Sequence, residues 1–179
     1  MTIPTFRYHA DPVASGSVVA SEAACLCCGQ ARGFVYHGPI YAEGEEPAPV
    51  CPWCIADGSA HERFDASFVD AEAFDETVSE ATVREITERT PGFATWQGET
   101  WPSCCEDAAV FVMPAGIAEI RARAPELEGQ VMSHIVYEMG ISGGAATRLL
   151  DTLHRDRSPT VYVFKCPRCE THLFHIDRT

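Results

Sequence analysis

Alternating and continuous runs of apolar residues predict five β-strands. Phe6 and Tyr8 alternate with polar neighbours, as in a short edge strand, within a proline-containing N-terminal arm that covers residues 1–24. The other four segments are rich in β-branched and aromatic residues and span 33–37, 108–113, 160–165 and 173–176. The last two flank a Cys-x-x-Cys turn, so we expect them to pair as a hairpin.

Apolar positions that recur every three to four residues predict helices between these strands. Thr77 and Glu80 match a capping box, which would begin a helix that ends at Arg89. Ser142 is expected to cap a later helix with a leucine-rich apolar stripe. The other predicted helices span residues 55–64, 117–124 and 125–139. The first of these is weakened by Gly58, since glycine is a poor helix former.

Short strands and short helices in this order predict an α+β protein, built from small zinc-bound modules packed with short helices. Residues 1–64 form the N-terminal module, in which a cysteine turn, a strand, a loop and a second cysteine pair at a helix start follow one another as in a treble clef. Residues 65–179 form an α+β part closed by a C-terminal knuckle that is expected to be zinc-ribbon-like. A chain of 179 residues can hold both parts in one compact unit.

All nine cysteines fall in four short clusters, and the first two clusters predict a zinc site. Cys25 and Cys28 form one Cys-x-x-Cys pair, and Cys51 and Cys54 form another, with 22 residues between the pairs. Each pair can present two thiolates to one tetrahedral ion from a single turn. Cys27 could replace Cys25 only with poorer geometry, so we expect it to be a free, partly buried thiol.

The remaining cysteines, Cys104, Cys105, Cys166 and Cys169, predict a second zinc site, for which two ligand sets are open. The side chains of adjacent cysteines diverge in an extended chain, so both can bind one ion only where the chain bends. A disulfide between them would be strained. In the alternative set, one histidine replaces a cysteine. The candidates are His134, His154, His172 and His175.

The chain carries 26 acidic and 13 basic side chains, a formal net charge of -13. Such a surface repels nucleic acids and anionic membranes and attracts a basic protein. The N-terminal residues lack a basic leader and an apolar run of signal-peptide length, and no segment reaches the roughly 18 apolar residues of a membrane span. We therefore expect a cytoplasmic protein, in which clustered cysteines bind metal, with two zinc ions expected, rather than form disulfides.

The sequence contains no familiar catalytic motif: His-Glu-x-x-His, Gly-x-Ser-x-Gly and a phosphate-binding glycine-rich loop are all missing. The spacing of Cys51 and Cys54 also occurs in thiol oxidoreductases, at a helix N-terminus. The preceding cysteine pair and the lack of a βαβ unit favour metal binding instead. We therefore expect a binding protein without catalysis. The alternative is an enzyme that depends on zinc or on the Cys27 thiol.

Several motifs spread over nearly the whole chain carry a family resemblance. They are Pro4-Thr5-Phe6-Arg7-Tyr8-His9, Cys25-x-Cys27-Cys28-Gly29-Gln30-Ala31-Arg32-Gly33, Cys51-Pro52-Trp53-Cys54-Ile55-Ala56-Asp57-Gly58-Ser59-Ala60, Arg89-Thr90-Pro91-Gly92-Phe93 with Trp96-Gln97, Cys105-x-Asp107, and Phe164-Lys165-Cys166-x-x-Cys169. With these motifs the chain resembles the CbrC family of bacterial proteins. The resemblance implies a cytosolic protein with a role in stress or toxin tolerance, because one family member is linked to tolerance of a DNase-type colicin. It implies no established enzymatic activity.

One departure from the CbrC pattern concerns the second cysteine group. The family more usually has His-Cys-Gly-Asp or Cys-Cys-Gly-Asp where this chain has Cys104-Cys105-Glu106-Asp107. The resemblance therefore implies that Cys105 is the safer ligand, and an alternation of His and Cys at the place of Cys104 also suits a ligand. The glycine of the turn is replaced by Glu106.

Overall fold

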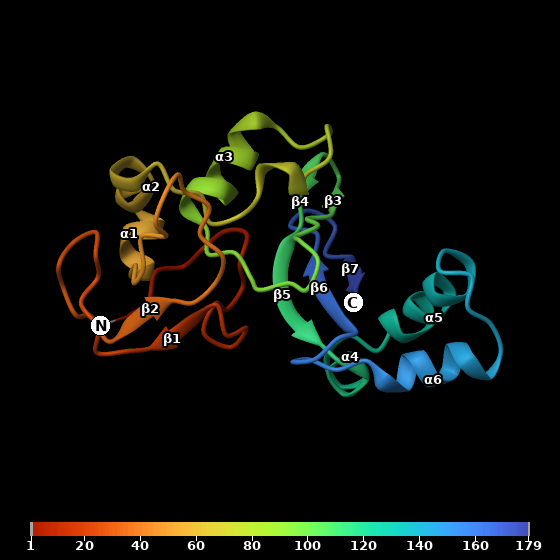
Figure 1. Cartoon of the computed structure of the whole chain (residues 1–179). Helices are drawn as coiled ribbons and strands as arrows, with labels where there is room; N and C mark the ends of the chain where they lie inside the picture. The colour runs from red at the N-terminus through yellow and green to blue at the C-terminus, as the bar shows by residue number, and fades with distance from the viewer. Residues whose placement is uncertain (1, 179) are drawn as a thin grey trace.

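The computed structural model describes residues 2–178, and its strands and helices confirm the predicted α+β class. Figure 1 shows the first two strands and α1 to α3 on one side, and a three-stranded sheet with helices α4 to α6 on the other. In chain order the elements are β1 (Val18–Ala20), β2 (Phe34–Tyr36), α1 (Pro52–Ala56), α2 (Ser59–Phe64), the 3₁₀ turn η1 (Ala71–Ala73), α3 (Glu80–Arg89), β3 (Ser103–Cys104), β4 (Asp107–Ala108), β5 (Val110–Ala115), α4 (Ile117–Arg123), α5 (Leu127–Tyr137), α6 (Gly144–Thr152), β6 (Thr160–Lys165) and β7 (His172–Asp177).

The N-terminal arm forms a turn rather than the predicted edge strand. Phe6 bridges His9 across this turn, and His9 in turn bridges Phe111 of β5. The Tyr8 side chain is fully buried, and its hydroxyl donates a hydrogen bond to Asp107 Oδ1 at 2.9 Å. The strand prediction was wrong because the arm turns inward to bury Tyr8 and His9 against the C-terminal half. The strand that pairs with β2 is instead β1, which the sequence pattern did not indicate.

Residues 52–64 form two short helices where the sequence predicted one. α1 ends at Ala56 and α2 begins at Ser59. Gly58 lies between them with a φ of 83°, in the left-handed region that glycine adopts without steric cost. Gly58 therefore not only weakens the predicted helix but divides it.

Helix α3 is confirmed, but its capping residue differs from the prediction. The Ser79 hydroxyl accepts the Thr82 N–H at 3.2 Å, which satisfies one of the free N–H groups of the first turn. Thr77 instead belongs to the preceding turn, where its N–H donates to Asp75 Oδ1 at 2.9 Å. The predicted capping box from Thr77 to Glu80 was wrong because Thr77 is engaged by Asp75 and lies too far from the helix start.

Strand β6 is the centre of the main sheet, with β5 and β7 as antiparallel neighbours. Its side chains alternate between the two faces: Val161 and Val163 belong to a core beneath the helices, while Tyr162 and Phe164 belong to an aromatic core on the other face. A bulge in β5 shifts the register after Phe111, so that Phe111 also joins the aromatic core.

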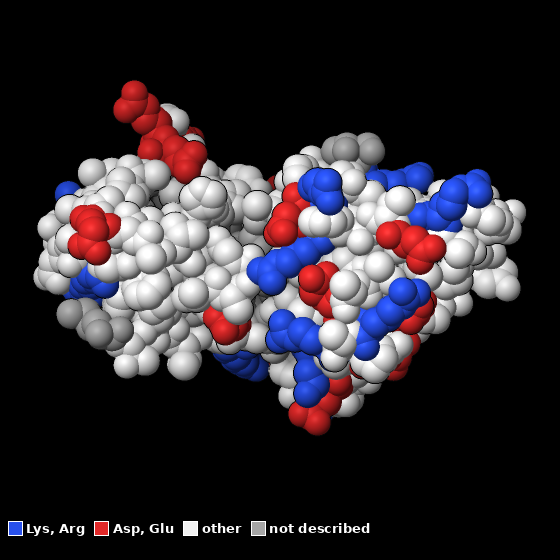
Figure 2. All heavy atoms as spheres, turned by 90° about the horizontal axis from the view of Figure 1, so that it is seen from below, with Lys and Arg blue, Asp and Glu red and all other residues white. Residues whose placement is uncertain are grey.

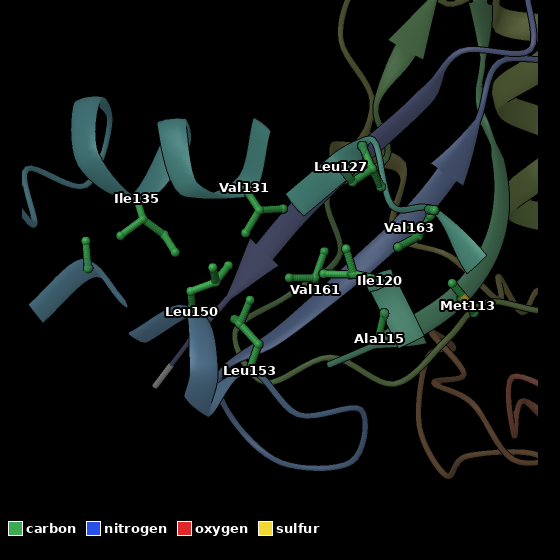
Figure 3. Packing of buried hydrophobic residues seen from close by; sticks show 12 residues of the cluster. Met113, Ala115, Ile120, Leu127, Val131, Ile135, Leu150, Leu153, Val161 and Val163 are labelled. Atoms are coloured by element: carbon green, nitrogen blue, oxygen red, sulfur yellow. The ribbon is translucent and has the colours of Figure 1, made fainter. Parts of the chain in front are cut away.

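Helices α4 to α6 cover the first of these two faces. Leu127, Val131 and Ile135 of α5 are fully buried, as their spacing of four residues predicts. Figure 3 shows Ile135 directed toward Leu150 of α6. Ser142 is not the predicted cap: α6 begins at Gly144 without a side-chain cap, because the chain reaches the helix through Gly143 in an unusual backbone conformation. Within residues 2–178 no helix has the length and apolarity needed to cross a membrane.

The other face of the sheet packs against the N-terminal half through the aromatic core. The Phe93 ring stacks on Phe111 with ring centroids 4.0 Å apart, and the Trp101 indole N–H donates to the Ala109 carbonyl at 2.7 Å. The large aromatic members of this core are Tyr8, Phe93, Trp101, Phe111, Tyr162 and Phe164. These side chains come from residues throughout the chain, and the expected division at residue 64 stays a prediction.

A buried carboxyl group lies where loops of the N-terminal half meet. Glu99 is 9% exposed; its Oε2 accepts the Asp70 N–H at 2.8 Å and the Tyr41 hydroxyl at 3.3 Å. Its Oε1 has no hydrogen-bond partner among the described residues. Burial raises the pKa of Glu99 from 4.5 to about 7, because the charged form loses its hydration.

We expect the Glu99→Gln variant to be more stable than the wild type above pH 7, by up to about 3 kcal/mol, and nearly equal to it at about pH 4. Since the folded-state pKa of Glu99 is raised, protonated Glu99 contributes stability to the folded protein below pH 4.5. This contribution is lost as the pH rises through about 7. Urea denaturation of both proteins at each pH gives the difference in unfolding free energy, in which the effects of other titrating groups cancel.

The matched control is Glu72→Gln, which removes the same charge from an exposed side chain of the same region. We expect Glu72→Gln to change the unfolding free energy by less than about 0.5 kcal/mol at both pH values. If the unfolding free energy of Glu99→Gln had the same pH dependence as that of the wild type, the raised pKa of Glu99 would be contradicted.

Candidate metal centres

The first cysteine group brings four sulfur atoms together between the turn that precedes β2 and the start of α1. Cys25 and Cys28 flank a turn before β2, while Cys51 and Cys54 lie at the start of α1. The Sγ atoms of Cys25 and Cys54 are 3.9 Å apart, those of Cys28 and Cys51 are 3.9 Å apart, and those of Cys51 and Cys54 are 3.6 Å apart. Four sulfurs about 2.3 Å from a tetrahedral ion are about 3.8 Å apart, so this group could hold a metal ion.

Backbone N–H groups near the first group are directed at its sulfur atoms. Gly29, with a φ of 72°, closes the first turn by donating its N–H to the Cys25 carbonyl at 2.7 Å. The Cys51 N–H donates to Cys25 Sγ at 3.2 Å, and Cys51 is also the residue that precedes α1. Such N–H donors stabilise a thiolate, and they fix the orientation of a ligand sulfur.

The four thiols are too crowded to ionise together without a cation. Burial alone would raise the pKa of Cys25, but the N–H groups of Cys28, Cys51 and Cys27 outweigh it and bring the pKa to about 7. Burial raises the pKa of Cys51 to about 11, and that of Cys54 further still. A divalent cation would offset both the burial and the repulsion between thiolates, because metal binding deprotonates its sulfur ligands.

The second group joins the β3–β4 hairpin to the turn between β6 and β7. Cys104 and Cys105 come from the hairpin, and Cys166 and Cys169 from the turn, with all four sulfurs within 4.8 Å of one another. Cys104 Sγ lies 3.7 Å from Cys105 Sγ and 3.7 Å from Cys169 Sγ. These distances again match a tetrahedral arrangement of thiolates around one ion.

A tight bend lets the two adjacent cysteines reach one point. Cys105 has a φ of 54° and Glu106 a φ of 58°, so two consecutive non-glycine residues are left-handed between β3 and β4. Glu106 therefore adopts the conformation for which a glycine is better suited. From the sequence we expected Cys104 and Cys105 to bind one ion only if the chain bends between them, and this bend meets that condition.

Asp107 supports the second group through its contacts with neighbouring residues, a role that the cysteine pattern did not reveal. Its Oδ1 accepts the Tyr8 hydroxyl at 2.9 Å and the Ala108 N–H at 3.0 Å, and its Oδ2 accepts from the Arg7 guanidinium at 3.1 Å. Arg168, inside the β6–β7 turn, lies 3.9 Å from the same Oδ2. Asp107 thus ties both cysteine-bearing turns to the N-terminal arm. The Cys105-x-Asp107 motif, with an acidic residue two positions after a candidate ligand, was the available signal.

The histidines considered for the second group lie elsewhere, and neither group contains one among residues 2–178. The His134 ring packs edge-on against Phe174, His172 contacts Glu126, and His154 Nδ1 accepts the Asp156 N–H at 3.0 Å. His175 lies in β7, where burial lowers its pKa. The structure thus brings together the four cysteines rather than the alternative set with a histidine.

Cys27 lies outside both groups. It is 7% exposed, and its thiol contacts the Ser59 hydroxyl at 3.6 Å. It is a free thiol as expected, but more fully buried than the sequence suggested.

Sequence comparison places the whole arrangement in one protein family. A family model described as "Uncharacterised protein family (UPF0167)" matches residues 3–178, which include both cysteine groups and Asp107. The chain belongs to the UPF0167 family.

Similar UPF0167 proteins occur in distantly related bacteria. The UPF0167 protein Mb2317 of Mycobacterium bovis and the UPF0167 protein MT2352 of Mycobacterium tuberculosis are each 42% identical to this chain over 176 residues, which cover 98% of this chain and 93% of theirs. The UPF0167 protein PA1536 of Pseudomonas aeruginosa is 42% identical over 181 residues, covering 99% of this chain and 98% of its own. No solved structure matches the chain significantly. The names of these UPF0167 proteins state no ligand and no activity.

Proposed function

We propose that each cysteine group binds one structural zinc ion, and that the protein acts by binding a basic partner protein rather than by catalysis. The observation that carries the metal assignment is the sulfur spacing of 3.6–3.9 Å in both groups. Bound zinc would cross-link chain segments that are far apart in sequence. Thiolates suit Zn²⁺, and a set of four is typical of structural rather than catalytic sites.

Metal analysis of protein purified under reducing conditions without chelator tests the assignment. We expect two zinc ions per chain. A folded protein without metal would overturn the proposal.

The alternative of a zinc- or thiol-dependent enzyme has less support. Each group already offers four thiolates, which would leave a bound ion without an open position for substrate. The Cys27 thiol is buried, whereas a reactive thiol is partly exposed.

A basic partner is favoured by the uneven charge of the molecule. Residues 1–99 carry 16 acidic and 5 basic side chains, whereas residues 100–179 carry 10 and 8. Figure 2 shows that Lys and Arg gather over the C-terminal half on the face in view, while acidic side chains project from the edge of the other half. Glu43, Glu45 and Glu46 are exposed on one loop. Such a surface would accelerate and strengthen association with a cationic protein.

The resemblance to the CbrC family adds a candidate for this partner. We take the DNase domain of a colicin as the basic protein, and tolerance of such a toxin in the bacterial cytoplasm as the role. Zinc would hold the docking loops of the acidic half in place, and the reducing cytoplasm would keep its thiols free to bind metal.

Neutralising the acidic loop should weaken this complex. We expect the triple variant Glu43→Gln, Glu45→Gln, Glu46→Gln to bind a colicin DNase domain about tenfold more weakly at low salt, at about 0.5 kcal/mol for each exposed charge. The matched control is Glu138→Gln, Asp151→Asn, Asp156→Asn, which changes the net charge equally at exposed positions of the other half. Titration calorimetry at low and high salt measures the affinity of each triple variant for the DNase domain. Equal affinities for the two variants, or no salt-sensitive binding by the wild type, would contradict the proposed surface.

A further inference from the structure

The two cysteine groups differ sharply in their exposure to solvent. In the first group, Cys25 and Cys51 are 1% exposed, Cys54 is 3% exposed and Cys28 is half-buried. In the second group, Cys105 and Cys169 are exposed and Cys104 is half-buried, although Cys166 is as buried as Cys25 and Cys51. A small solute can therefore reach two fully exposed sulfurs of the second group, while the first group contains no exposed cysteine.

The exposed sulfurs of the second group also have partners within reach. Cys169 Sγ lies 3.7 Å from Cys104 Sγ, and these residues belong to different turns, so a bond between them would not create the strained ring of adjacent cysteines. The Cys169 thiol donates a hydrogen bond to the Thr171 hydroxyl oxygen at 3.3 Å, which fixes the position of its sulfur. Oxidation of cysteine depends on access, and the exposed Cys169 combines access with a partner sulfur within reach.

We propose that the second cysteine group is a reaction site for hydroperoxides, at which oxidation joins Cys104 to Cys169 and releases the bound zinc. The inference rests on the proposed function, in which both groups hold zinc. It goes beyond that function because it assigns a chemical reactivity to one group and a purely structural role to the other.

The reaction balances with hydrogen peroxide as the oxidant. The Cys169 thiolate attacks one peroxide oxygen, the O–O bond breaks, and Cys169 sulfenic acid and hydroxide form. The Cys104 thiolate then attacks the Cys169 sulfur, which forms the S–S bond and expels a second hydroxide. The two thiolates lose two electrons, the peroxide gains them, and both hydroxides take up protons from solvent to become water. The group then retains only two free thiolates, those of Cys105 and Cys166, which would be too few to hold a zinc ion.

The test uses the full-length protein after its zinc content has been measured. Hydrogen peroxide is added in the presence of a chromophoric zinc chelator, and peptide mapping follows the cysteines. We expect one zinc ion to be released at least about tenfold faster than the other, since access limits oxidation, and a Cys104–Cys169 disulfide to form in step with the fast release. Dithiothreitol and added zinc should restore the starting state.

The control variant Cys27→Ser removes the one cysteine that belongs to neither group and should retain the fast release. Release of both ions at one rate, or earlier oxidation of Cys25, Cys28, Cys51 or Cys54, would overturn this inference while leaving two structural zinc ions intact. A purified protein that contains no zinc in its second group would overturn the inference and the proposed function together.

Discussion

Cys54→Ser is expected to reduce the zinc content from two ions to one and to unfold the N-terminal module. The elements around the first group are too short to be stable alone: α1 has five residues, α2 has six, and β1 and β2 have three each. Loss of one ligand removes most of the metal-binding free energy, so we expect the unfolding free energy to fall by more than about 4 kcal/mol. Metal analysis and urea denaturation measure the two effects.

Cys27→Ser is the matched control for this prediction, because it makes the same chemical change at the residue next to the proposed ligand Cys28. Cys27 contacts the Ser59 hydroxyl but is not among the grouped sulfurs, so we expect both zinc ions to remain and the stability to change by about 1 kcal/mol or less. If Cys54→Ser retained two zinc ions and wild-type stability, the first group would not be a metal centre.

Trp101→Ala is expected to cost about 3–5 kcal/mol of unfolding free energy, the range for removing a large buried aromatic side chain. The Trp101 side chain is 1% exposed and packs against Phe74, Phe93 and Phe164, with ring centroids 5.5–5.8 Å apart. Its indole N–H bonds to the Ala109 carbonyl, next to β5, which the variant would leave without this donor. Urea denaturation followed by circular dichroism, with zinc present, measures the loss.

Trp96→Ala provides the comparison, since Trp96 is 46% exposed and lies only five residues away. It makes one side-chain hydrogen bond, from Nε1 to the Thr160 hydroxyl at 3.1 Å, so we expect a cost of about 1 kcal/mol. Similar losses for the two tryptophan variants would mean that the aromatic core does not hold the two halves together.

The sequence was sufficient to predict the elements whose pattern is local. Strand β6 occupies the predicted residues 160–165, and Cys25, Cys28, Cys51 and Cys54 form the group that the spacing of the first two pairs predicted. For the second group the spacing of Cys166 and Cys169 predicted half of a site and left its other ligands open. Period-two and period-four patterns and Cys-x-x-Cys turns depend on neighbouring residues, which the sequence presents directly.

The features that the sequence did not reveal depend on contacts between distant segments. The local alternation of apolar and polar residues placed Tyr8 in an edge strand. Its burial instead depends on Asp107, 99 residues away in the chain, which a local pattern does not show. The union of Cys104 and Cys105 with Cys166 depends on left-handed residues at Cys105 and Glu106, neither of which is a glycine. A local pattern cannot predict a conformation that is disfavoured locally and held by tertiary contacts.

The pairing of β5 with β6 gives the sheet two ends that connect to different parts of the chain. Ala115 faces Val161 at one end, where the chain leaves for helices α4 to α6 and later returns, while Val110 faces Lys165 at the cysteine end, about 15 Å away at the usual strand rise. Residues 116–159 are thus an excursion that starts and finishes at the same place. Insertions, deletions or whole substitutions within that excursion should be tolerated in related chains without disturbing the sulfur atoms, provided that the sheet keeps an apolar cover.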